Sequence, residues 1–446
     1  MTMIEKSNAD PLHAIIVAHT VNPHTIDSVP MIGYRIAVGL GKLTDATYIF
    51  HARHRRDVAD AFPGDRVIYA GSVKMADGLL QISNMVFPGR RVPILIINLL
   101  EYLFFDLDAF RKARRVIRQR RRIDFVLRVN PISYRFASVL PRLPVPVFTG
   151  PHNGGMRWPP AFAHLERSQK TAERLRFLGD IMHRLYQDTG RYAGIFVAHE
   201  LCARTVGKKH RDKVIYCSEN GVQGPGQPSP WSGDARRLLY VGRMVPLKVI
   251  DVILRALARL PQSVHLTLVG DGPQRADLEV LASELGVKDR CLFVGAIPHD
   301  KLDRYYAEAG VFVFPSVRES GGMVVLEAMA HALPCLVADW GGPPIYTRDA
   351  GIQLSVESPE ALEDDLVDTL SRLLADTDEG RRMGSASRHV LSGQYIWSRK
   401  AELLLEAIRE RLTQEPSVSV AALPAGMPLA QGHTVKGLSL TARDGG

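Results

Sequence analysis

The stretch Ser316–Ala332, SVRESGGMVVLEAMAHA, decides how the rest of the chain is interpreted. It follows an apolar run at 311–315 that is typical of a buried strand, and two glycines then lead into a segment with helical character. A glycine-rich turn between a strand and a helix suits a phosphate, because backbone N–H groups and the positive end of the helix dipole face the anion. The stretch therefore indicates a phosphate-binding turn at Gly321 and Gly322.

Two carboxylates flank this turn. Glu319 precedes the glycines, and Glu327 lies on the predicted helix. A carboxylate repels a diphosphate, so these side chains are better suited to accept hydrogen bonds from the hydroxyls of a sugar or a ribose. The stretch alone is consistent with a nucleoside diphosphate that carries a sugar, and equally with a buried helix that bears two surface glutamates.

Composition indicates an ordinary globular chain with more than one domain. The 446 residues exceed one typical domain, and 46% of them are hydrophobic and 23% charged. The 4 cysteines show neither metal-ligand spacing nor a disulfide framework, which fits a reducing cytoplasm. Residues 1–13 contain no long apolar segment, so we expect no signal peptide.

The formal net charge of +9 favours an anionic partner, which could be a nucleic acid, a membrane surface or a charged substrate. No basic motif is interleaved with aromatic residues, and only 7% of the residues are aromatic. We therefore expect no nucleic-acid partner.

Hydrophobic periodicity predicts two α/β domains, each with a parallel sheet. Strand-like and helix-like segments alternate on both sides of a stretch rich in Gly, Pro and Ser. We expect an N-terminal domain over 1–222, a linker over 223–234, a C-terminal domain over 235–390, a helix over 391–413 and a disordered tail over 414–446. Within the first domain we expect strands at 12–18, 46–51, 123–129, 145–149 and 194–198 and helices at 33–40 and 172–185.

Residues 88–122 combine an apolar run with a basic one. The apolar part, 93–105, is too short to span a membrane, which requires about 20 such residues. Lys and Arg then dominate 111–122. The segment is either a core helix followed by a solvated helix face, or a peripheral contact with anionic lipid headgroups worth roughly 1 kcal/mol per cation. Asp106 and Asp108 imitate a metal-binding pair but lie in helical sequence, so we expect no metal there.

The C-terminal half resembles the family 4 retaining glycosyltransferases of the GT-B fold. The matching pieces follow the family's order: Glu219-Asn220-Gly221-Val222, Gly242-Arg243 with Lys248, Val269-Gly270-Asp271-Gly272-Pro273, Phe293-Val294-Gly295, Pro315-Ser316, the paired glutamates and Gly341-Gly342-Pro343. The N-terminal half matches more loosely, through 130–132 and 150–155. The resemblance implies two doubly wound Rossmann-like domains that face each other across a cleft. It also implies that a C-terminal helix containing Trp397 and Lys400 crosses back to the first domain.

The resemblance further implies roles for individual residues. Arg243 and Lys248 would neutralise the charge of a departing nucleoside diphosphate, so neither a metal nor a cofactor is expected. Glu319 would contact hydroxyls of the transferred sugar, and Glu327 the ribose. Backbone groups that hold the donor would come from Gly242, Gly272, Gly321, Gly322, Met323 and Val324. His152 is expected to contact the reacting sugar or the acceptor, while Gly33, Asn153 and His199 would line the cleft.

Three positions depart from the family pattern. Ala332 and Val249 replace glycines, and Ile345 replaces a glutamate. None of these changes removes a charge assigned to chemistry, so together they indicate a divergent subgroup.

We therefore expect a retaining, metal-independent glycosyltransferase that moves a sugar from a nucleoside-diphosphate sugar to a carbohydrate or lipid-linked acceptor. Its expected role is bacterial envelope or exopolysaccharide assembly, in the cytoplasm or on the inner face of the membrane. No nucleophile is evident near the motif, which favours attack of the acceptor hydroxyl on the face that the diphosphate leaves. A sugar-nucleotide epimerase or phosphorylase of the same fold and a non-catalytic glycosyltransferase-like binding subunit remain as alternatives.

Overall fold

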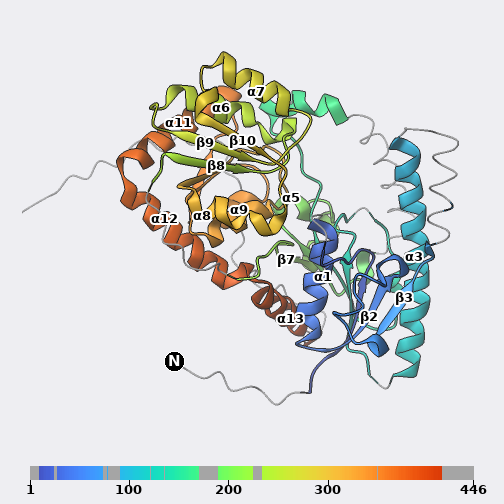
Figure 1. The fold of residues 1–446 in the computed structure, drawn as a ribbon. Helices are drawn as coiled ribbons and strands as arrows, with labels where there is room; N and C mark the ends of the chain where they lie inside the picture. Colours follow the sequence, from blue (N-terminus) through green and yellow to red (C-terminus); the bar gives the residue numbers. More distant parts are fainter. Residues whose placement is uncertain are drawn as a thin grey trace, which may run out of the picture.

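In a computed structural model of the chain, the structure describes residues 10–413 apart from 25–27, 74–77, 79–90, 121, 135, 170–188, 225–233 and 349. These residues form two domains, each built on a parallel sheet (Figure 1). The predicted helix at 172–185, most of the predicted linker and the predicted tail at 414–446 lie outside the described residues.

The N-terminal sheet has seven parallel strands in the order β3-β2-β1-β4-β5-β6-β7. They are β1 (His13–Ala18), β2 (Asp45–His51), β3 (Val67–Ala70), β4 (Phe125–Asn130), β5 (Val147–His152), β6 (Gly194–Val197) and β7 (Val214–Tyr216). The strands predicted in this domain correspond to β1, β2, β4, β5 and β6. The edge strands β3 and β7 were not predicted, because they are short and half-buried and leave only a weak hydrophobic signal.

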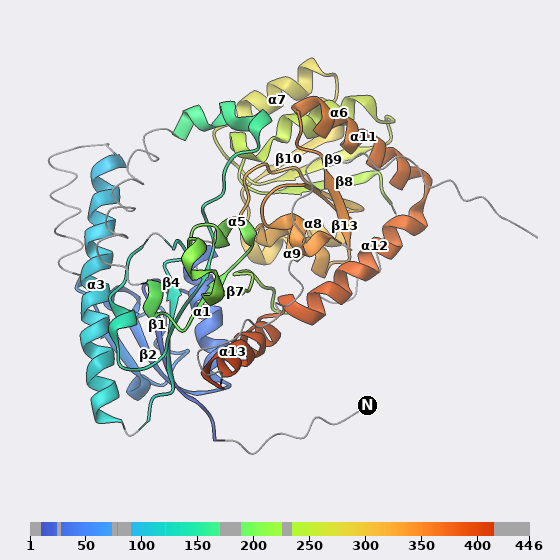
Figure 2. The same cartoon turned by 180° about the vertical axis from the view of Figure 1, so that it is seen from behind.

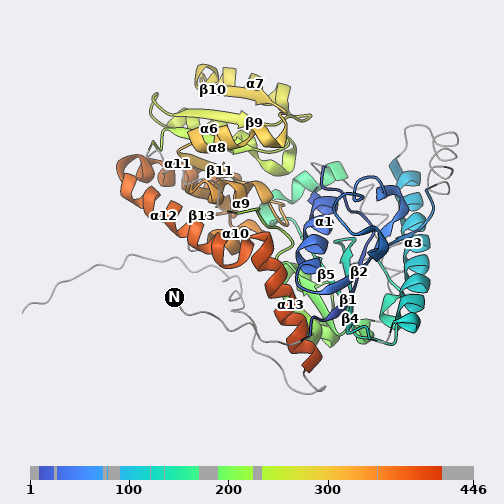
Figure 3. The ribbon, with the colours of Figure 1, turned by 60° about the horizontal axis from the view of Figure 1, so that its bottom comes forward.

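Helices cover both faces of this sheet. On β1, Ile16 packs into the core beneath α1 (Ser28–Gly41) and α13 (Trp397–Thr413), whereas Ile15 and Val17 pack beneath α3 (Arg91–Gln119). The alternation follows from the two-residue period of a strand. Figure 3 shows α1 and α13 side by side, with α3 on the other side of the sheet.

Two helices of this domain differ from the prediction. Helix α1 begins at Ser28 rather than at Gly33, because Pro30 falls in its first turn, where a missing N–H costs nothing. The apolar and basic segments at 93–122 are not two units, since α3 runs unbroken through most of both. After Pro93 in its first turn, this helix contains neither proline nor glycine. None of the described helices has an apolar stretch of the length that a membrane crossing requires.

The C-terminal sheet is wound in the same way, in the order β10-β9-β8-β11-β12-β13. Its strands are β8 (Arg237–Val241), β9 (His265–Val269), β10 (Cys291–Gly295), β11 (Val311–Phe314), β12 (Cys335–Ala338) and β13 (Gly351–Leu354). Its helices are α6 (Ile250–Arg259), α7 (Arg275–Glu284), α8 (Asp303–Glu308), α9 (Met323–Ala330), α10 (Pro343–Thr347), α11 (Pro359–Ala375) and α12 (Thr377–Val390). In both sheets the winding reverses at the centre, between β1 and β4 and between β8 and β11, and ligands bind at the carboxyl ends of such strand pairs.

The chain crosses between the domains more often than the predicted boundaries imply. Helix α13 returns to the first domain, as predicted, and buries Leu404 and Ile408 in its core. Earlier in the chain, Trp158 and Phe162 pack into the core of the C-terminal domain. Figures 1 and 2 both show the helical turn at Pro160–Gln169 beside α7. Residues 1–222 therefore do not form one self-contained domain.

Two of the departures from the family pattern have left-handed backbones. Val249 has φ 49° and Ala332 has φ 56°, which are conformations that glycine adopts without the clash of a Cβ atom. The family's glycines at these positions thus have a conformational reason. This chain keeps the same backbone and accepts the strain.

We predict that Ala332→Gly stabilises the protein. Removal of the Cβ atom relieves a left-handed strain of about 1–2 kcal/mol, and the greater freedom of glycine in the unfolded chain offsets about 0.5–1 kcal/mol of that gain. The midpoint of urea or thermal unfolding measures the difference. Ala328→Gly within α9 is the matched control and should destabilise, so a lower midpoint for Ala332→Gly as well would contradict the prediction.

Candidate active site

Loops that follow strands of the two sheets meet at one place. Asn153, directly after β5, donates a 2.8 Å hydrogen bond from Nδ2 to Oε1 of Glu219, which follows β7. A Cβ atom on Gly321 would lie 2.5 Å from this Oε1 and 1.8 Å from Nδ2 of Asn220. Only glycine fits there, so the predicted phosphate-binding turn is pressed directly against the N-terminal domain.

Glu219 is almost completely buried at this junction, with 1% of its surface exposed. Burial raises its pKa above the ordinary value for a carboxyl group, and the hydrogen bond from Asn153 opposes that shift only in part. The carboxyl therefore serves as a hydrogen-bonding group in the domain contact.

A second contact lies alongside. The indole Nε1 of Trp340, after β12, donates to the backbone oxygen of Arg157 at 2.8 Å. The guanidinium of Arg318, in the loop after β11, lies 4.9 Å from the ring centroid of Trp158. Both contacts join the segment after β5 to the loops that flank the phosphate-binding turn.

The structure brings Lys248 and Glu319 together. The Lys248 ammonium pairs with Oε2 of Glu319 and lies 4.5 Å from the ring centroid of Phe314. Oε1 of Glu319 accepts a 3.1 Å hydrogen bond from the backbone N–H of Gly322. The lysine follows β8 and the glutamate follows β11, so the pair lies at the point where the winding of the sheet reverses.

The turn leaves donors free for an anion. Gly322, at φ 65°, is the N-cap of α9, and within the described part of the chain the N–H groups of Met323 and Val324 bond to no acceptor. Unpaired N–H groups at a helix N-terminus attract negative charge. The geometry therefore supports the predicted binding of a phosphate here.

Glu327, the predicted ribose contact, is held by two residues that the sequence analysis missed. Its Oε1 lies 2.9 Å from Nε2 of His299, and its Oε2 accepts from the Tyr306 hydroxyl at 2.9 Å. The hydrogen bond to Glu327 raises the pKa of His299. These partners lie 28 and 21 positions from Glu327, so no local spacing could have revealed them.

Arg243 and the glycines before and after it complete the C-terminal side. The Arg243 side chain is exposed directly after β8, and its guanidinium has no ion-pair partner among the residues described. Gly272 packs against the chain itself, because a Cβ atom there would lie 2.3 Å from the backbone oxygen of Met244. Gly242, at φ 155°, lets the turn after β8 form.

Three predicted cleft residues of the N-terminal domain are placed differently. His152 is the last residue of β5, not a loop residue, and its ring is 1% exposed, with Nε2 2.9 Å from the Thr149 hydroxyl. His199 is 4% exposed, and burial lowers its pKa to about 4. Gly33 lies within α1, where a Cβ atom would meet the backbone oxygen of Thr20 at 2.4 Å. All three face the protein's own atoms rather than a cleft.

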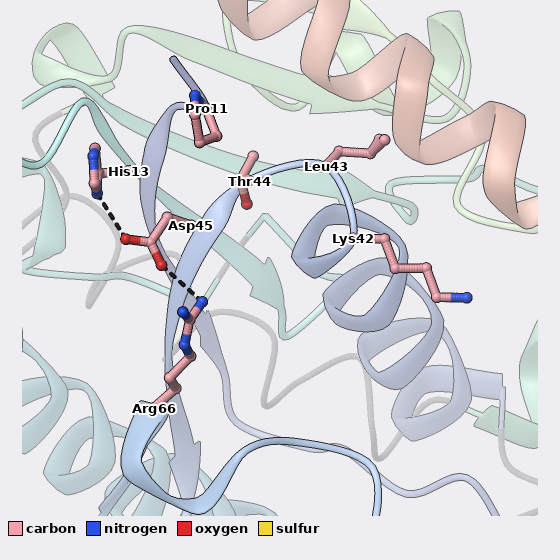
Figure 4. A pocket seen from close by; sticks show the side chains of 7 residues that line it. All are labelled: Pro11, His13, Lys42, Leu43, Thr44, Asp45 and Arg66. Carbon is pink, nitrogen blue, oxygen red and sulfur yellow. Dashed lines mark ion pairs between the residues drawn. The ribbon is translucent and has the colours of Figure 1, made fainter.

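A hollow elsewhere on the first domain is a poor candidate. It is lined by Pro11, His13, Lys42, Leu43, Thr44, Asp45 and Arg66 at the amino ends of β1 and β2 (Figure 4). These residues lie at the edge of the sheet opposite the phosphate-binding turn. The Asp45 carboxylate is already paired with His13 at 2.9 Å and Arg66 at 2.7 Å, which leaves little polarity for a ligand.

Comparisons with known proteins agree with this geometry. Residues 227–390 match the family described as Glycosyl transferases group 1. A D-inositol 3-phosphate glycosyltransferase of Nocardia farcinica is 36% identical over 206 residues, which are 44% of this chain and 43% of that protein. A GDP-mannose-dependent alpha-(1-6)-phosphatidylinositol monomannoside mannosyltransferase of Mycobacterium tuberculosis is 30% identical over 187 residues, or 40% and 48% of the two chains. The match thus spans less than half the length of these relatives.

Solved structures extend the likeness to the whole fold. Anabaena Alr3699/HepE in complex with UDP superimposes with a TM-score of 0.59 at 14% identity, over 90% of this chain and 100% of that one. The apo lipopolysaccharide outer core galactosyltransferase WaaB gives a TM-score of 0.57 at 14% identity, over 89% and 99%. The C-terminal domain of this chain therefore belongs to the group 1 glycosyltransferases, and the chain has their two-domain GT-B fold.

Proposed function

We propose that the protein is a retaining glycosyltransferase that transfers a sugar from a nucleoside-diphosphate sugar to a hydroxyl of a carbohydrate or lipid-linked acceptor. One observation carries the proposal: the Lys248–Glu319 pair lies beside the free N–H groups of α9, where the winding of the C-terminal sheet reverses. This arrangement offers a cation and helix donors to a diphosphate, and a carboxylate to a sugar.

The chain's own residues can perform the transfer without a metal. The diphosphate would bind at the N-terminus of α9, and Lys248 and Arg243 would stabilise the charge that grows on its oxygen as the bond to the sugar C1 breaks. Arg243 can grip phosphate with two donors, whereas Lys248 acts as a point charge. The acceptor oxygen would bond to C1 on the same face, and its proton would pass to the departing phosphate oxygen.

Glu319 and Glu327 would set the orientation of the donor. Each carboxylate has about four lone-pair sites. Glu319 uses some of them for Lys248 and Gly322, and Glu327 uses some for Tyr306 and His299, so both can still accept sugar or ribose hydroxyls. Their partners hold the carboxylates in place before the donor arrives, which lowers the entropic cost of binding.

The names of the relatives suggest where to look for substrates. They include GDP-mannose and inositol phosphate, and a similar fold has been solved with UDP. We propose an acceptor of the bacterial envelope or an exopolysaccharide. A thermal-shift screen of UDP- and GDP-sugars followed by linkage analysis of the product tests the proposal, and a stable covalent glycosyl-enzyme would refute the same-face mechanism.

We predict that Lys248→Met and Glu319→Gln each lower kcat by about 10²-fold or more, the effect typical of losing one group that stabilises a transition state. Steady-state turnover of the donor identified by the screen provides the measurement. Arg237→Ala, at the amino end of the same strand as Arg243, is the control and should retain wild-type turnover. Full activity in Glu319→Gln would instead favour the non-catalytic alternative.

We also propose that the protein works at the inner face of the membrane and contacts it through α3. Exposed apolar side chains at Leu100, Phe104 and Leu107 follow one another at helical spacing. The same outer stripe continues with exposed Arg111, Arg114 and Arg118. An apolar segment that continues into a cationic one suits the boundary between acyl chains and anionic headgroups.

We predict that Arg114→Gln combined with Arg118→Gln weakens partitioning onto phosphatidylserine vesicles by roughly thirtyfold, because each cation near the surface contributes about 1 kcal/mol. Co-sedimentation at low salt measures the partitioning. Arg381→Gln with Arg382→Gln on α12 changes net charge equally on another surface and serves as the control. Equal loss in both double variants would show that only net charge matters.

A further inference from the structure

The N-terminal sheet has its own point of reversed winding, between β1 and β4, and His19 lies there directly after β1. The backbone N–H groups of His19 and Thr20 both donate to Oδ1 of Asn130, at 2.7 and 3.1 Å. Nδ2 of Asn130 donates back to the Thr20 oxygen at 2.7 Å. Because Asn130 ends β4, these bonds fix the loop that carries His19 between the two strands.

The His19 ring is held by a buried carboxylate. Its Nε2 lies 3.0 Å from Oε2 of Glu101 on α3, and Glu101 is only 4% exposed. Oε1 of Glu101 lies 2.7 Å from Nε2 of His51 and also pairs with Arg53. Burial alone would raise the pKa of Glu101, but the hydrogen bonds from His19, His51 and Arg53 hold it well below the ordinary value.

This arrangement determines which ring nitrogens carry protons. Nδ1 of His51 accepts from the backbone N–H and from the Nε–H of Arg53, both at 3.1 Å, so its proton lies on Nε2. His19 likewise directs Nε2 at a carboxylate and must carry its proton there. Its Nδ1 is then a lone-pair acceptor, and no residue in the described part of the chain bonds to it. Burial lowers the pKa of His19, which keeps the ring neutral at pH 7.

His19 lies on the same sheet edge as the residues that meet the phosphate-binding turn. Two residues after Asn130, the Ile132 oxygen accepts from the Asn153 N–H at 2.8 Å. Asn153 in turn holds Glu219 beneath Gly321. A short series of contacts therefore leads from His19 to the turn that would hold the donor.

We propose that His19 and Arg53 form the hydroxyl-binding site for a polyhydroxylated acceptor, a sugar or a cyclitol, and that Glu101 is the positioning residue. The proposal rests on the proposed function. The His19 Nδ1 accepts a hydrogen bond from an acceptor hydroxyl, and the Arg53 guanidinium, whose side chain is 38% exposed, donates to a neighbouring oxygen. Neither residue takes the proton in the transfer, so their loss affects binding of the acceptor more than of the donor.

The test separates acceptor use from donor use. Transfer is measured from the nucleotide sugar that most stabilises the wild type to myo-inositol and to methyl α-mannoside, and hydrolysis of the same donor is measured without them. His19→Phe keeps the ring but removes Nδ1, and should raise the KM for the probes about tenfold, with donor binding and hydrolysis unchanged. Arg53→Gln should do the same.

Two further variants distinguish a binding role from a structural one. His19→Asn places an amide oxygen near the position of Nδ1 and should restore most of the probe KM. His13→Phe, at the amino end of the same strand, should behave as wild type. In the wild type the probe KM should rise as the pH falls and Nδ1 gains a proton beside Glu101, His51, Arg53 and Tyr102, and His19→Asn should lack this rise.

The outcomes keep the two proposals apart. A wild-type chain that hydrolyses the donor overturns the acceptor site alone if it transfers to neither probe, or if its probe KM is unchanged in both His19→Phe and Arg53→Gln. A wild-type chain that neither binds nor hydrolyses any nucleotide sugar overturns the proposed function itself.

Discussion

The contact of Gly321 with Glu219 and Asn220 determines how the two domains face each other. A glycine is required there, because any side chain would overlap with the Asn220 amide at 1.8 Å. The same contact sets the start of α9 against the first domain, so the free N–H groups of the helix lie at the domain boundary. Helix α13, bound by Lys400 to the Ser218 oxygen at 2.7 Å, returns to this junction and secures it.

Each sheet has a paired charge at its point of reversed winding. In the C-terminal sheet it is Lys248 with Glu319, and in the N-terminal sheet it is Glu101 with His19 and its neighbours. A buried charge is costly unless it is paired, and pairing also fixes its orientation. One site can thus present a cation and a carboxylate to a donor, while the other presents a lone pair and a guanidinium to an acceptor.

The strained residues lie on the elements that carry these groups. Val249 directly follows Lys248, and Ala332 lies just beyond the helix that carries Glu327. Left-handed conformations of non-glycine residues persist only where surrounding packing enforces them, and both residues are buried. The chain has therefore replaced two glycines without altering the backbone path that positions Lys248 and Glu327.

Local sequence was sufficient to predict the parallel strands, the glycine turn before α9 and the partnership of Lys248 with Glu319, because strand periodicity, helix starts and an ordered motif are encoded by near neighbours along the chain. It could not reveal that His152 is buried, that His299 and Tyr306 hold Glu327, or that Glu101 meets His19 82 positions away. Those partnerships depend on the order in which strands pair and on which face of a helix packs against the sheet. Only the folded arrangement decides them, since the free energy of pairing a buried charge arises between segments distant in sequence.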